Sequence, residues 1–140
     1  MSELPMIIIR KFIPSDSEYI VDILKTNGQF YSSTIEGPDS MIRVAKCSSA
    51  VFNVALIDNK PIGVIKAVFD GSRALIHLLS VNPDFQRKGV GKRLVNSVIS
   101  ELKEKGASTL SVTTSESSQD FWEKLLFRRL PVYLMLRDPL

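Results

Sequence analysis

The feature that most constrains the fold is a glycine-containing loop that leads directly into a long amphipathic helix. Residues 78–95 read LLSVNPDFQRKGVGKRLV, an apolar strand segment followed by a turn at Pro83, the loop and the start of the helix. From Val90 to Leu102 apolar residues recur every three or four positions, which indicates one buried face of a helix that ends at Lys105. A strand that feeds a helix in this way is typical of mixed α/β or α+β domains.

The start of this helix is suited to bind an anion. Gly89 and Gly91 flank the first helical turn, whose backbone N–H groups have no partner within the helix and carry the positive end of the helix dipole. Four basic side chains stand close by in sequence: Arg87, Lys88, Lys92 and Arg93. These parts suit a phosphate or pyrophosphate group. Two nucleotide motifs are excluded, because Arg93 stands where a Walker A loop needs Ser or Thr and Leu94 stands where a dinucleotide fingerprint needs its third Gly.

The whole chain, residues 1–140, is predicted to form one domain with the element order βα(α)βββαβαβ. Two tight turns, at Asp58-Asn59 and at Asp70-Gly71, join three apolar runs into an antiparallel meander. The predicted strands are 7–12, 51–57, 62–69, 74–81, 109–114 and 132–136. The predicted helices run from Ser15 or Asp16 to about Lys25 and over 41–47, 90–105 and 119–126, with a polar loop at 29–40.

Composition excludes several other classes of protein. Cys47 and His77 are the only cysteine and histidine, so we expect neither a disulfide framework nor a metal site. A net charge of +3 and a pI near 9.1 are too mild to imply nucleic acid. The opening residues lack the features of a signal peptide, and no apolar run approaches the roughly 18 residues of a membrane span. We therefore expect a cytoplasmic protein that binds neither nucleic acid nor membranes.

Two sequence motifs resemble one known family. The hexapeptide Gln86-Arg87-Lys88-Gly89-Val90-Gly91 fits the Q/R-x-x-G-x-G/A loop of the GNAT family of N-acetyltransferases, and VNPDFQRKGVGKRLV as a whole is similar to that family's acetyl-CoA-binding motif. Further on, FWEKLLF at 121–127 resembles the family's FYEKLGF segment. The resemblance implies a central V-shaped mixed sheet flanked by helices, with acetyl-CoA held between two diverging strands.

The resemblance also implies where the cofactor binds. Backbone groups of Leu79 and Val81 would pair with the pantetheine arm like an added strand, and the amides from Gln86 to Lys92 would cradle the pyrophosphate. The implied cofactor-binding residues are Leu79, Ser80, Val81, Gln86, Arg87, Lys88, Gly89, Val90, Gly91, Lys92 and Trp122. Trp122 either packs in the core or contacts the pantetheine. The co-substrate implied is acetyl-CoA, without a metal.

The same resemblance implies transfer of the acetyl group to a primary amine by direct attack in a ternary complex. His77 stands where many members have Glu, and strict alternation along its strand would put it on the face of Leu79 and Val81. With an ordinary pKa of about 6.5, His77 is a candidate base or water-positioner, or simply a partly buried strand residue. Trp122 replaces the Tyr that often acts as the acid, which leaves Tyr133 as a substitute.

Some points stay open at the level of sequence. Phe30 and Tyr31 lie in the loop that often borders the family's acceptor site, although loop aromatics also serve as anchors. Leu126 replaces the usual Gly, a change expected to remove a left-handed residue from the end of the last helix. The missing acid also fits an alternative function, an acyl-CoA-binding or regulatory module with weakened catalysis. The acceptor amine is not defined by the motifs, and a homodimer is compatible with the family.

Overall fold

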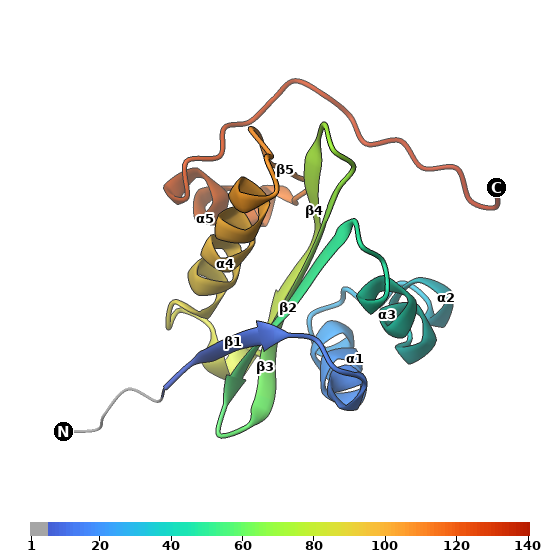
Figure 1. The fold of residues 1–140 in the computed structure, drawn as a ribbon, viewed down its shortest axis with the longest axis vertical. Helices are drawn as coiled ribbons and strands as arrows, with labels where there is room; N and C mark the ends of the chain where they lie inside the picture. Colours follow the sequence, from blue (N-terminus) through green and yellow to red (C-terminus); the bar gives the residue numbers. More distant parts are fainter. Residues whose placement is uncertain (1–5) are drawn as a thin grey trace.

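A five-stranded mixed sheet organises residues 6–140, the part of the chain that the computed structural model describes (Figure 1). Its strands are β1 (Ile8–Lys11), β2 (Ala50–Ile57), β3 (Lys60–Phe69), β4 (Ala74–Val81) and β5 (Ser111–Val112). Strands β1 to β4 pair antiparallel in chain order, and β5 joins parallel to β4. The predicted meander and mixed class are confirmed. The expectation that the opening residues are not a signal peptide concerns a segment that includes residues 1–5, which lie outside the described part.

Helices cover both faces of the sheet and create two apolar cores (Figure 1). The first core lies under α4 (Val90–Glu104) and α5 (Gln119–Lys124). The second core lies under α1 (Ser17–Thr26) and α3 (Pro38–Ala45), with α2 (Ser33–Glu36) beside α3. The buried residues of α4 are those its periodicity predicts: Val90, Leu94, Val95, Val98 and Leu102. Single 3-10 turns occupy residues 14–16, 83–85 and 116–118.

Strands β4 and β5 part soon after they begin. Their parallel pairing is limited to Leu75 with Ser111 and Ile76 with Val112, whereas β4 continues alone on that side to Val81. Asn82 N donates to the Ile62 carbonyl of β3 at 2.8 Å. Because bonding alternates along an antiparallel pair, the backbone groups of residues 79 and 81 face away from β3, toward the gap beside β5. The C-terminal half of β4 is therefore an open sheet edge.

A β-bulge interrupts β4 at His77. On β3, Lys66 pairs with Leu78 and the next residue, Ala67, pairs with Ile76, so His77 is the extra residue with no partner. The bulge breaks the strict alternation assumed from the sequence. Ile76, before the bulge, packs on the first core together with Leu79 and Val81, although strict alternation would put residue 76 on the face of Leu78, which packs on the second core. The prediction that alternation carries through from His77 to Val81 is therefore wrong.

Several predicted elements differ from the structure. The strand predicted over 132–136 is wrong, because this exposed segment has no strand beside it and the outermost strand, β5, is only two residues long. Helix α2 was missed because residues 29–40 read as a polar loop. Ser32 Oγ accepts the N–H of Ile35 at 3.3 Å and so caps this short helix. Helix α3 begins at Pro38 rather than at residue 41.

The end of α5 keeps the left-handed residue that the sequence was expected to remove. Leu126 adopts a φ of +72°. Leu126 N donates to the Glu123 carbonyl at 3.0 Å and Phe127 N donates to the Trp122 carbonyl at 3.1 Å, the two bonds of a Schellman motif. The ring of Phe127 packs against Trp122, 5.1 Å between centroids, and closes the motif. Tertiary packing of Phe127 therefore holds a turn that a glycine would form without strain.

Candidate active site

The loop between β4 and α4 presents a row of unbonded backbone N–H groups. Arg87 and Gly89 have positive φ values of +63° and +82°, which turn successive N–H groups toward one side. The first bond of the helix runs from Arg93 N to the Gly89 carbonyl at 3.1 Å, and the N–H groups of residues 87–92 meet no acceptor within the described chain. A concave row of N–H groups at a helix N-terminus attracts anions.

The basic side chains near this loop divide into two groups. Three are exposed beside the N–H groups: Arg87, Lys88 and Lys92. Lys88 Nζ lies 5.5 Å from the ring centroid of Phe85, so this cation is held against the loop. Arg93 points elsewhere, because its guanidinium donates to the Ile7 carbonyl at 2.7 Å. Arg93 therefore fixes the start of β1 to α4 rather than serving the loop.

The packing behind the loop explains its small residues. Val90 is buried in the first core, and a Cβ on Gly91 would stand 3.2 Å from the ring of Phe121. Trp122 is buried in the same core, edge-on to Phe121 at 5.0 Å. Gly91 thus lets α4 approach α5, while Gly89 has open space around it and is required for its left-handed φ.

Three side-chain amides occupy the open edge of β4. Gln29 Nε2 donates to the Leu79 carbonyl at 3.1 Å. The Val81 carbonyl accepts from both Asn27 Nδ2 and Gln86 Nε2 at 2.9 Å. Asn27 Nδ2 also donates at 2.8 Å to the buried hydroxyl of Ser80.

The sequence reading found Gln86 but missed the other two amides. Asn27 was interpreted only as the stop signal of α1, and Gln29 as part of a polar loop. Both lie about fifty residues before β4 in the chain, and no local pattern pairs them with that strand. Their contacts tie the segment after α1 directly to the open edge.

His77 lies beside Lys66, a charged residue that the sequence analysis did not single out. Burial, and then the positive charge of Lys66 on β3, lower the pKa of His77 below its ordinary value. Burial also lowers the pKa of Lys66, while the carboxylate of Glu36 on α2 acts to raise it. Although His77 is an exposed residue of β4, both effects on its pKa favour the neutral form of its ring.

The remaining predicted residues lie around the segment after α1 and in the C-terminal tail. Phe30 is partly buried under the ammonium of Lys25, 5.0 Å from its ring centroid. Tyr31 is exposed, and its hydroxyl donates to Asp138 at 2.9 Å, which ties the tail to this loop. Tyr133 is 94% exposed in the tail. The structure thus places Tyr133 in solvent rather than against β4.

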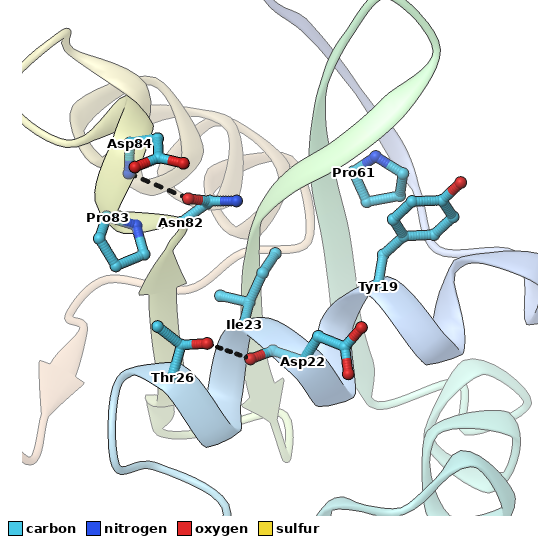
Figure 2. A pocket seen from close by; sticks show the side chains of 8 residues that line it. All are labelled: Tyr19, Asp22, Ile23, Thr26, Pro61, Asn82, Pro83 and Asp84. Carbon is cyan, nitrogen blue, oxygen red and sulfur yellow. Dashed lines mark hydrogen bonds between the residues drawn. The ribbon is translucent and has the colours of Figure 1, made fainter.

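A cavity of about 370 Å³ lies between α1, the start of β3 and the turn that follows β4 (Figure 2). It is lined by Tyr19, Asp22, Ile23, Thr26, Pro61, Asn82, Pro83 and Asp84. Within the turn, Asn82 Oδ1 accepts the N–H of Asp84 at 2.9 Å (Figure 2). None of the residues predicted for the site lines this cavity.

Two searches of residues 6–140 gave negative results. No group of three or more His, Cys, Asp or Glu side chains in this range is placed to hold a metal ion. None of the helices in the same range is long and apolar enough to cross a membrane.

Two curated proteins are similar to this chain in sequence. An uncharacterized N-acetyltransferase, ycf52, from Pyropia yezoensis is 27% identical over 103 residues, 69% of this chain and 59% of that protein. The [ribosomal protein bS18]-alanine N-acetyltransferase of Haemophilus influenzae is 33% identical over 85 residues, 57% of each chain. This chain thus spans less than two thirds of the length of either relative.

The fold matches solved structures over the whole chain. The aminoglycoside N-acetyltransferase AAC(6')-Iy, solved in complex with CoA, superposes with a TM-score of 0.81 at 18% identity, covering 100% of this chain and 99% of that one. The sequence model of the acetyltransferase (GNAT) family matches residues 19–127, which include both motifs and the open edge of β4. The chain therefore belongs to the GNAT family of acetyltransferases.

Proposed function

We propose that this protein transfers the acetyl group of acetyl-CoA to a primary amine. The observation that carries this proposal is the row of unbonded N–H groups at residues 87–92, directly after the open edge of β4. The row suits a pyrophosphate, and the edge suits an extended arm that pairs like a strand. CoA contains both parts in the order in which the chain presents them.

In this proposal the amides from Arg87 to Lys92 cradle the pyrophosphate, whereas the predicted amide of Gln86 already donates to the Pro83 carbonyl at 3.4 Å. The exposed charges of Arg87, Lys88 and Lys92 attract the phosphates. The pantetheine arm lies along Leu79, Ser80 and Val81. An amide N–H of pantetheine would then donate to the Leu79 carbonyl in place of Gln29 Nε2. Trp122 is buried in the core against which Leu79 and Val81 pack, a position from which it would support this strand.

The reaction requires an uncharged amine. The amine lone pair attacks the thioester carbonyl, a C–N bond forms, the C–S bond breaks, and CoA leaves as a thiolate that takes up a proton. The amine loses one proton, which we assign to His77 directly or through a water. A lowered pKa suits His77 to this role, because the ring is then neutral and able to accept a proton near pH 7. Tyr133 can donate to the thiolate only if the tail folds over β4.

The second candidate function is an acyl-CoA-binding module with weakened catalysis. Two observations favour it: Trp122 is buried where the family often has its acid, and Tyr133 is in solvent. This candidate shares the cofactor site with the first. The two differ in turnover, so release of free CoA in the presence of an amine panel separates them.

Calorimetric titration with acetyl-CoA tests the cofactor site. Gly89→Glu adds a negative charge among the N–H groups and should abolish binding. Gly71→Glu is the matched control, because Gly71 also has a positive φ, +97°, and open space around it but lies in the turn between β3 and β4. Both variants place a side chain at a positive φ, and circular dichroism checks that each folds. A folded wild-type protein that does not bind acetyl-CoA would overturn the proposal.

A further inference from the structure

Lys66 is a partly buried cation on the face of the sheet opposite to α4. In the ladder it pairs with Phe52 of β2 and Leu78 of β4, both of which pack on the second core. Paired residues of neighbouring strands share a face, so the Lys66 side chain lies on the side of α1 and α3. Within residues 6–140 the ion pairs are Arg10–Asp16 and Lys11–Glu101, which leaves Lys66 without a carboxylate within 4.0 Å.

Glu36, the carboxylate whose charge acts on Lys66, is committed elsewhere. Glu36 Oε2 accepts the backbone N–H groups of Tyr31 and Ser32, both at 2.9 Å, and so holds the segment after α1. Glu36 acts on Lys66 only through space, without an ion pair. A half-buried ammonium without a partner has lost part of its hydration and has gained no ion pair in return. An anionic group of a ligand would supply that pair.

The position of Lys66 relates it to the reacting amine. His77, the bulged residue, lies between the β4 partners of Lys66 and Ala67, so the candidate base and the cation are neighbours on the ladder. When the amine of an acceptor reaches His77, a group that is attached a few bonds away from that amine would lie near Lys66. A second ammonium in that place would be repelled, whereas a carboxylate would be attracted.

We propose that Lys66 selects the acceptor by pairing with a carboxylate that the acceptor carries a few bonds from its amine, as in a free amino acid. This inference rests on the proposed function and names its substrate class. Polyamines and aminoglycosides, which bring several positive charges, fit this face poorly. A peptide N-terminus, whose neighbouring carbonyl is an uncharged amide, gains nothing from Lys66.

The test compares free amino acids with their amides and with short peptides as acceptors, in wild type, Lys66→Met and Lys66→Arg. Wild type should prefer acid over amide by about tenfold in kcat/KM, the effect of roughly 1.4 kcal/mol. Lys66→Met should lose this preference, and Lys66→Arg should keep most of it. Comparing the ratio between variants cancels the different basicity of the amines. Lys60→Met, an exposed lysine on the same strand, is the control and should leave the ratio unchanged.

The outcomes separate the two proposals. Acetyl-CoA binding, measured by calorimetry, should be the same in Lys66→Met and wild type, which also shows that the variant folds. If both bind acetyl-CoA and the acid-to-amide ratio is unchanged in Lys66→Met, the role of Lys66 is refuted while the proposed function stands. If peptide N-termini are acetylated and free amino acids are not, the substrate class is refuted. If wild type does not bind acetyl-CoA, the proposed function fails first.

Discussion

Leu126 holds a backbone conformation that its side chain disfavours. Its φ of +72° is left-handed, and its side chain is 94% exposed, so no packing of its own offsets the strain. A non-glycine residue in this conformation costs about 1–2 kcal/mol. Replacing Leu126 by glycine would remove this cost, but part of the gain in stability is lost because glycine has more conformational freedom in the unfolded chain. We expect Leu126→Gly to raise the free energy of unfolding by about 1 kcal/mol, measured by urea denaturation. Leu126→Ala keeps the strain and should show no comparable gain; an equal gain would show that exposure of leucine, not φ, is the cause.

The pKa of His77 reports on the charge of Lys66 next to it. It is the only histidine, so its titration can be followed by NMR without ambiguity. We expect a pKa below 6.5 in wild type, because burial and the charge of Lys66 both disfavour the imidazolium. Lys66→Met should raise the pKa of His77 part of the way back, with burial and Glu36 unchanged. If His77 is the base, activity falls as pH drops through this pKa, so the acid limb of the rate profile should move to higher pH in Lys66→Met. Lys60→Met should change neither; a lower His77 pKa in Lys66→Met would contradict the assignment.

At the scale of elements, two ion pairs attach β1 to its neighbours with unequal strength. Asp16 is 2% exposed and accepts from Arg10 Nη1 and Nη2 and from the Ile13 N–H, at 2.8–2.9 Å. Asp16→Ala leaves those donors unpaired and should cost about 2 kcal/mol. Lys11 bonds Glu101 at 2.7 Å, but its side chain is exposed, so Lys11→Ala should cost about 0.5 kcal/mol. Urea denaturation of both variants checks this order. Equal losses would mean that burial does not control the strength of these pairs.

The elements that the sequence predicted well are those whose pattern is local and complete. Helix α4 was placed within one residue at its end because its buried positions recur along a single helix. The strand predicted over 132–136 failed because an apolar run becomes a strand only beside another strand, and β5 offers two residues. The bulge at His77 was missed for a related reason. It depends on the register between β3 and β4, which no pattern within β4 alone reveals.

At the scale of the molecule, the candidate site combines one local motif with several distant residues. The motif at 86–91 is contiguous, so the sequence located the loop and its N–H groups. Asn27 and Gln29 reach the edge of β4 only after α1 has packed on the sheet, and Lys66 meets His77 only through strand pairing. The part of the site that would bind the cofactor was therefore predictable. The part that would face the acceptor was not, because it is built by contacts between residues far apart in the chain.

Gln29 links the part of the site that would bind the cofactor to the part that would face the acceptor, and this link can be measured. Its amide donates to the Leu79 carbonyl, the group that pantetheine would use in the proposed complex. Binding acetyl-CoA must then break the Gln29 bond, so the segment 28–37, which contains Gln29, loses one of its ties to the sheet. Gln29→Ala removes the competing donor and should bind acetyl-CoA about threefold more tightly, the effect of one exposed hydrogen bond of about 0.7 kcal/mol. Gln119→Ala removes an exposed amide that bonds only Glu123, and it should bind like wild type. Hydrogen exchange of residues 28–37 should rise when acetyl-CoA binds to wild type. Weaker binding by Gln29→Ala would instead make Gln29 part of the cofactor site.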